Sequence, residues 1–163
     1  MITTVNYHLV KQCNYRCKFC YATFNDFDAP TAGQRRHEAV VEALALSGQF
    51  RKINFAGGEP MLLPYLGSLL ARAKRNGLET SVITNGSRLS LEWLARQVGQ
   101  LDILGISLDS DRAETNARIG REQQGRQLDL ERLQRIADFC HVNGILLKIN
   151  TVVNAFNQDE LLA

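Results

Sequence analysis

The stretch TTVNYHLVKQCNYRCKFC, residues 3–20, joins a strand pattern directly to three cysteines. Apolar and polar side chains alternate over 3–10, and many of them are β-formers, which predicts a β-strand. Cys13, Cys17 and Cys20 follow that strand with a spacing of three and then two residues. The stretch therefore places sulfur ligands at the carboxyl end of the first strand.

Strand and helix patterns then alternate along the rest of the chain. Further strands are predicted at 52–57, 79–86, 101–110 and 145–155, and helices at 33–48, 62–77, 90–99 and 128–144. Thr31 and Asn157 are expected to cap the helices that follow them, Ser90 precedes another, and Gly77 is a typical helix stop. The β-then-α order predicts a parallel sheet with right-handed crossovers, in a doubly wound sheet or part of a (β/α) barrel.

Composition and charge limit the classes of function. The 163 residues are 45% hydrophobic and 22% charged, which is typical of one globular domain over 1–163 with a real core. A formal charge of +2 does not indicate nucleic acid or a membrane surface as a partner. No apolar run approaches the roughly 20 residues that span a bilayer, and no signal-peptide pattern opens the chain. The cytoplasm is the expected compartment.

Chemically unusual residues follow each predicted strand, where both candidate architectures bind ligands. The cysteines come after the first strand, Gly57-Gly58-Glu59-Pro60 after the second and Asn85-Gly86 after the third, while the fourth ends at Ser107 with Asp109 beyond it and the fifth carries Lys148 and Asn150. Because parallel strands end at the same edge of a sheet, we expect these residues to form one site.

The cysteines indicate a metal centre. Structural zinc sites usually pair two short cysteine hooks, whereas this chain has one hook of three. Soft thiolates favour iron–sulfur clusters and zinc, and three of them suit a four-iron cluster whose fourth iron is open to a small ligand. Zinc remains an alternative, with His8 or Cys140 as a possible fourth ligand. Cys140 is otherwise expected to be a buried structural thiol.

CxxxCxxC after a first strand, with aromatic Phe19 before the last cysteine, resembles the signature of the radical S-adenosylmethionine (SAM) enzymes. The resemblance implies that Cys13, Cys17 and Cys20 hold a [4Fe–4S] cluster whose open iron chelates SAM. One electron then cleaves SAM to methionine and a 5′-deoxyadenosyl radical. The other SAM-binding residues it implies are Phe19 near the adenine, the GGEP motif Gly57, Gly58, Glu59 and Pro60 at the amino group, and Ser107, Arg121 and Asn150.

Two of these residues also have simpler interpretations. Arg121 would anchor the methionine carboxylate through a bidentate pair, but a lone arginine in ARIGREQQG is usually a solvated loop charge. Asn150 would contact the adenine edge, but an asparagine that ends a strand is often only a turn former.

Several segments narrow the resemblance to the viperin family of nucleotide-modifying radical SAM enzymes in antiviral defence, over about Thr3 to Glu160. They are NYH before the cysteines, KINF before GGEP, and KIN with NxFN near the end. The resemblance implies conversion of CTP, or another nucleoside triphosphate, to its 3′-deoxy-3′,4′-didehydro form. It also implies that Asn6 contacts the nucleotide and that Lys52 and Lys148 contact the triphosphate. We expect these cations to converge at the barrel mouth, with Lys148 in a strongly apolar strand.

The resemblance implies a partial (β/α)6 barrel, with about five βα units in this chain. The chain is expected to be the N-terminal part of a longer enzyme, or else a second chain completes the barrel. A flavodoxin or ferredoxin would supply electrons. Two other functions stay open: a radical SAM enzyme with another substrate such as a peptide, and a non-enzymatic zinc-binding module.

Overall fold

Parallel strands form a single sheet in the computed structural model, which describes residues 3–22 and 32–160. The strands of that described part are β1 (Thr4–His8), β2 (Lys52–Ala56), β3 (Glu79–Thr84), β4 (Ile103–Ser107) and β5 (Leu146–Asn150). They lie in the order β1-β2-β3-β4-β5, so each strand pairs with the next one along the chain. This order contains no reversal point, and it therefore favours a barrel segment over a doubly wound sheet.

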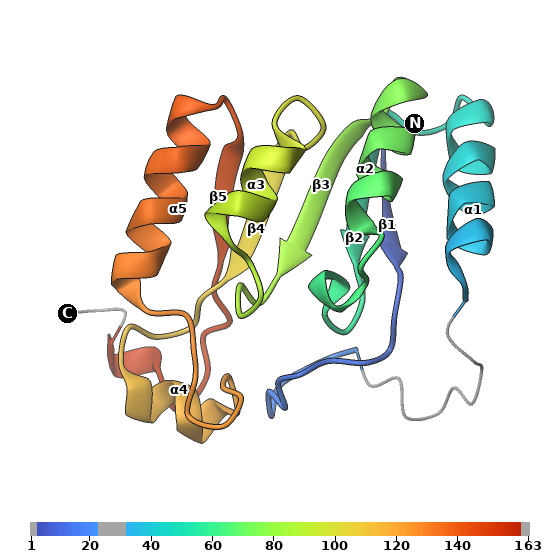
Figure 1. Ribbon diagram of the computed structural model, residues 1–163. Helices are drawn as coiled ribbons and strands as arrows, with labels where there is room; N and C mark the ends of the chain where they lie inside the picture. The colour runs from blue at the N-terminus through green and yellow to red at the C-terminus, as the bar shows by residue number, and fades with distance from the viewer. Residues whose placement is uncertain (1–2, 23–31, 161–163) are drawn as a thin grey trace.

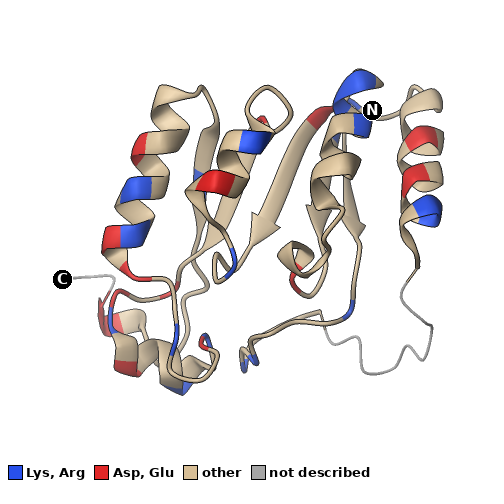
Figure 2. Ribbon diagram, viewed as in Figure 1, with Lys and Arg blue, Asp and Glu red and all other residues tan. Residues whose placement is uncertain are grey.

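Helices connect the strands, and most of them lie on one face of the sheet. They are α1 (Gln34–Leu46), α2 (Leu66–Arg75), α3 (Leu91–Gln97), α4 (Ala113–Ile119) and α5 (Leu130–Val142), with 3₁₀ turns η2 (Pro60–Leu62) and η3 (Gln158–Glu160). Figure 1 shows α2, α3 and α5 on the same side of the strands. Both signs of charge occur on α1, α3 and α5, so these outer helices carry no single-sign face (Figure 2). In the described ranges, no helix is both long enough and apolar enough to cross a membrane.

Most predicted elements are confirmed, and their ends differ for local reasons. The helix predicted at 62–77 begins only at Leu66, because Pro64 disfavours a helical conformation at Leu63, which is extended (φ −85°, ψ 117°). Ser90 caps α3, since its Oγ accepts a hydrogen bond from the Trp93 amide at 3.1 Å. Thr31 lies outside the described residues.

Asn157 does not cap a following helix in the predicted way. Its side chain is fully buried and bridges two segments instead. Oδ1 accepts a hydrogen bond from the Asn154 amide at 2.7 Å, and Nδ2 donates to the Asp109 carbonyl at 2.8 Å. Asn157 therefore fixes the turn after β5 against the end of β4.

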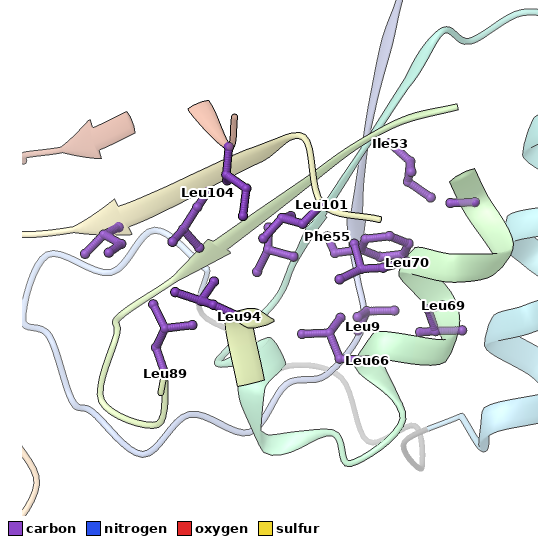
Figure 3. Close-up of a cluster of buried hydrophobic side chains, with 14 of the residues drawn as sticks. Leu9, Ile53, Phe55, Leu66, Leu69, Leu70, Leu89, Leu94, Leu101 and Leu104 are labelled. Carbon is purple, nitrogen blue, oxygen red and sulfur yellow. The ribbon is translucent and has the colours of Figure 1, made fainter. Parts of the chain in front are cut away.

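The hydrophobic core lies between the sheet and the helices. Ile53 and Phe55 of β2 and Leu104 of β4 are fully buried, and they pack with leucines of α2 and α3 (Figure 3). Side chains of a strand alternate between the two faces of the sheet. Asn54, between Ile53 and Phe55, therefore points to the face that these helices leave uncovered.

Cys140 of α5 belongs to this core and is fully buried, as expected. Burial raises the pKa of its thiol to about 11, so the thiol stays protonated at pH 8. We predict that iodoacetamide at pH 8 modifies Cys13, Cys17 and Cys20 of the metal-free protein but not Cys140, as measured by peptide mass spectrometry. All four should react in guanidinium chloride. A native Cys140 that reacts as fast as Cys20 would contradict the buried position.

Candidate active site

The three cysteines lie on one loop, residues 9–22, which crosses the carboxyl ends of the strands (Figure 1). We call this segment the cysteine loop. The end of β2 holds its first part, since the amides of Gly58 and Glu59 donate to the carbonyls of Val10 and Gln12 at 2.7 and 2.8 Å. These backbone bonds explain why the loop turns across the sheet directly after β1.

The C-terminal end of α4 holds the middle of the cysteine loop. The Arg16 amide donates to the Gly120 carbonyl at 3.0 Å, and the Lys18 amide donates to the Ile119 carbonyl at 2.9 Å. Both loop residues flank Cys17, so α4 determines where that thiol lies. The sequence patterns do not predict α4, because seven residues are too few for a clear helical periodicity.

Asparagine side chains join the same loop to the end of β3. Asn85 Nδ2 donates to Asn14 Oδ1 at 2.9 Å and lies 3.8 Å from the Cys13 sulfur. Asn14 Nδ2 in turn donates to Ser87 Oγ, also at 2.9 Å. Three separate elements therefore fix the loop.

The two glycines of GGEP allow the cysteine loop to pass close to the end of β2. A Cβ atom on Gly57 would lie 2.7 Å from the Val10 carbonyl oxygen, and one on Gly58 would lie 2.1 Å from that of Gln12. Gly57 also has φ +143°, a conformation that other residues rarely adopt. The missing side chains therefore leave room for the backbone of the cysteine loop.

Glu59 is buried and accepts hydrogen bonds from the protein itself. Its carboxylate accepts from Thr84 Oγ1 at 2.7 Å, from the Asn85 amide at 2.8 Å and from the Met61 amide at 2.9 Å. Burial raises the pKa of this carboxyl group, and the hydrogen bonds oppose that shift. Glu59 thus links the ends of β2 and β3, and Pro60 beside it is also buried and begins η2.

All three loop cysteines are free thiols, with Cys13 and Cys17 half-buried and Cys20 exposed. Burial raises the pKa of Cys13 and Cys17. Across residues 3–22 and 32–160, no three His, Cys, Asp or Glu side chains are grouped closely enough for a single metal ion. Cys140 lies in the core and is not available as a fourth zinc ligand. Three thiolates can ligate a four-iron cluster that leaves one iron open, whereas a structural zinc site needs a fourth protein ligand.

Arg121 is 9% exposed, so its interpretation as a solvated loop charge is wrong. It directly follows Gly120, which closes α4 with φ +87°. Its guanidinium forms an ion pair with Asp109, whose carboxylate is fully buried, and lies 5.8 Å from the Phe19 ring centroid. The sequence pattern shows Asp109 only as a residue beyond a strand end, and it does not indicate the pairing of Asp109 with Arg121.

Ser107, Arg121 and Asn85 line one small cavity at the strand ends, together with Tyr15. Asn150 is the register partner of Ser107 on the neighbouring strand. Its Nδ2 is buried and, in the part of the chain that the structure describes, has no hydrogen-bond partner. The structure therefore brings Phe19, GGEP, Ser107, Arg121 and Asn150 together around the cysteine loop.

The three predicted substrate residues lie on the uncovered face of the sheet, but they do not all lie at the carboxyl ends of the strands. Asn6 Oδ1 accepts a hydrogen bond from Asn54 at 2.9 Å. Lys52 begins β2 and pairs in register with Thr4 and Glu79, at the opposite edge from the cysteines. Convergence of both lysines at the barrel mouth is therefore wrong.

The solvent exposure of Lys148 also differs from what its apolar strand suggests. It is exposed, because β5 is an edge strand of the described sheet and its neighbours Leu146 and Ile149 are 63% and 42% exposed. The apolar sequence around Lys148 does not reflect burial within this chain.

A sequence model of the radical SAM superfamily matches residues 7–160. The chain belongs to the radical SAM superfamily. Membership implies a [4Fe–4S] cluster and SAM as the cofactors of these proteins. Among the residues described above, the free thiols of the cysteine loop and the unpartnered Asn150 amide fit those two groups.

Curated relatives of this radical SAM chain are named S-adenosylmethionine-dependent nucleotide dehydratases. Those from Lacinutrix mariniflava and Flammeovirga pacifica are 42% and 38% identical over 99% and 98% of this chain. The dehydratase RSAD2 of Oncorhynchus mykiss is 39% identical over 97%. The chain spans 35%, 57% and 46% of the lengths of these three relatives.

Solved radical SAM structures share the fold. The anSMEcpe protein with bound AdoMet superposes with a TM-score of 0.74 at 17% identity, covering 99% of this chain and 46% of that one. Streptococcus suis SuiB, bound to its precursor peptide SuiA, gives 0.64 at 15% identity, covering 93% and 40%. These likenesses confirm the partial barrel architecture.

Proposed function

We propose that residues 1–163 form the core domain of a viperin-like radical SAM nucleotide dehydratase. The observation that carries the proposal is the 38–42% identity to nucleotide dehydratases over almost the whole of this chain. Since the chain spans only part of those relatives, the activity is assigned to the whole protein, of which this domain holds the cofactors.

The proposed reaction converts a nucleoside triphosphate, CTP or another, to its 3′-deoxy-3′,4′-didehydro form in antiviral defence. When bound, the cluster and SAM would supply a 5′-deoxyadenosyl radical for abstraction of the ribose C4′ hydrogen. The 3′-hydroxyl leaves as water, and one electron and one proton complete the product. We assign the electrons to a flavodoxin or ferredoxin and the enzyme to the cytoplasm, where free thiols stay reduced.

The protein's own residues would bind and orient the cofactors. Cys13, Cys17 and Cys20 would hold the cluster, and their loop is fixed at β2, β3 and α4. Arg121 keeps guanidinium nitrogens beyond the Nε that faces Asp109, and these could bind the SAM carboxylate. Phe19, GGEP, Ser107 and Asn150 would surround the same bound SAM. Because Glu59 already binds three protein donors, we assign it mainly to shaping the turn that receives the SAM amino group.

The uncovered sheet face would bind the nucleotide. Asn54 Oδ1 is buried without a hydrogen-bond partner in the described structure, and it lies beside Asn6. Lys52 and Lys148 have no ion-pair partner among the described residues. They lie on the same face of the sheet, at different positions along the strand direction. We propose that the triphosphate extends along this face from Lys148 toward Lys52, away from the cysteines.

Metal analysis tests the cofactor assignment. Anaerobic reconstitution of the 163-residue chain should give iron and sulfide near four per chain, with a brown chromophore that Cys17→Ala greatly weakens. Cys140→Ala is the matched control and should keep the chromophore. Stoichiometric zinc in place of iron would end the enzyme assignment.

Product analysis tests the substrate. The longer protein, reduced with dithionite and supplied with SAM, should release more 5′-deoxyadenosine when its own nucleoside triphosphate is added. Each of CTP, UTP and GTP is tried separately, and mass spectrometry identifies the nucleotide product. If no nucleotide raises 5′-deoxyadenosine although a peptide does, the protein modifies peptides instead.

A further inference from the structure

A second recess lies outside the cofactor site, against the other side of the cysteine loop. It has a volume of about 490 Å³, which falls within the range of small-molecule sites. Its walls come from the loop after β3, the segment between α4 and α5, and the first turn of α5. Its lining residues include Tyr15, Arg88, Gln123, Arg126, Gln127 and Arg132.

The recess is strongly basic. Arg88, Arg126 and Arg132 line it, and among the residues that the structure describes no carboxylate does. Arg132 donates to the backbone carbonyls of Ser87 and Leu89, which fixes its position. The Arg88 and Arg126 side chains make no hydrogen bond or ion pair within residues 3–22 and 32–160. Three guanidinium groups facing one hollow without a counter-charge favour a bound anion.

Two buried polar groups in the walls also lack partners. Tyr15 is only 3% exposed, and its hydroxyl has no hydrogen-bond partner in the described structure. The same holds for Gln127 Oε1. Leaving a buried polar group unpaired is unfavourable, so such groups usually have a ligand or water as a partner. Both residues also border the cavity that contains Ser107 and Arg121, so they form the wall between the two hollows.

Local backbone geometry holds the recess in shape. Gln123 and Arg126 pair across a two-residue turn in which Gln124 and Gly125 have φ +54° and +74°. Such a turn is tight and presents the flanking side chains in a defined direction. Asn14 of the cysteine loop donates to Gln123 Oε1 at 2.9 Å, which connects the turn to the loop.

We infer that this recess binds a small phosphorylated molecule at a site separate from the SAM and nucleotide sites proposed above. Arginines suit phosphate because a guanidinium can donate two parallel hydrogen bonds. A concave site with a buried phenol in its wall fits a small ligand better than the flatter surface of an acidic protein. A ligand there would contact Tyr15, which lies between Cys13 and Cys17, and it would therefore stabilise the cysteine loop.

Calorimetric titration of the 163-residue chain with inorganic pyrophosphate tests the inference. Arg88→Gln with Arg126→Gln should weaken binding by at least about tenfold, because it removes two charged contacts. Both arginines are exposed and unpaired, so the variant should fold normally. The matched control is Arg35→Gln with Arg75→Gln, which removes the same charge from other exposed positions and should leave the affinity unchanged. Tyr15→Phe should also weaken binding.

A second variant distinguishes this site from the proposed nucleotide site. Lys52→Gln with Lys148→Gln should leave pyrophosphate binding at the recess intact, whatever it does to nucleotide turnover. The inference fails if pyrophosphate does not bind, if the control pair weakens it equally, or if only the lysine pair does. It also fails if an acidic polypeptide binds the arginines and pyrophosphate does not.

Discussion

The Gly120→Ala variant is expected to hold much less iron after reconstitution than the unsubstituted protein, although the substitution lies outside the cysteine loop. Gly120 has φ +87°, and a Cβ atom there would lie 2.2 Å from the Arg16 carbonyl oxygen. That neighbour is backbone, so the contact can be relieved only by moving the loop. Because Arg16 directly precedes Cys17, the displacement would carry a cluster ligand away from its position.

Gly77→Ala is the matched control for this prediction. Gly77 also ends a helix with a left-handed conformation, φ +82°, but nothing lies within 4 Å of a Cβ placed there. Both substitutions should lower the free energy of unfolding by about 1–2 kcal/mol through the left-handed backbone alone. Only Gly120→Ala should lower the iron content, measured per folded chain by colorimetric iron assay. Equal iron retention in the two variants would show that α4 does not position the loop.

Arg121→Gln is expected to lower the free energy of unfolding by about 3–5 kcal/mol, the usual effect of removing one partner of a buried ion pair. The Asp109 carboxylate is fully buried, and within the described residues it would keep only the Val152 amide, which donates to Oδ1 at 2.8 Å. An unpaired buried carboxylate is costly, so the end of β4 and the turn after β5 should both loosen. Urea denaturation of the cofactor-free protein measures the change.

Two further variants test the cause of that loss. Arg96→Gln removes an arginine whose partner Glu92 is exposed, and it should cost no more than about 1 kcal/mol. Combining Arg121→Gln with Asp109→Asn removes the unpaired charge and should recover much of the lost stability. If the double variant is no more stable than Arg121→Gln alone, the buried charge is not the reason for the destabilisation.

Local sequence patterns predicted the parts of the site that lie directly beside strand ends. The cysteines follow β1 and GGEP follows β2, and parallel pairing brings such residues to one edge of the sheet. Patterns did not predict the pairing of Arg121 with Asp109, because the two residues lie on different segments and neither has a local signature. The expectation that Lys52 lies at the barrel mouth came from the family resemblance, whereas its place at the start of the strand predicted at 52–57 already indicates the amino end of a parallel sheet.

The sequence by itself determined the β-then-α order and the cysteine spacing, because each depends on residues close together in the chain. Only the tertiary structure decided that α4 and Asn85 hold the cysteine loop, and that Lys148 is exposed on an edge strand. Those properties depend on contacts between segments far apart in the chain, such as Arg16 with Gly120. Burial and pairing are properties of the assembled sheet and its connections, and no local pattern contains them.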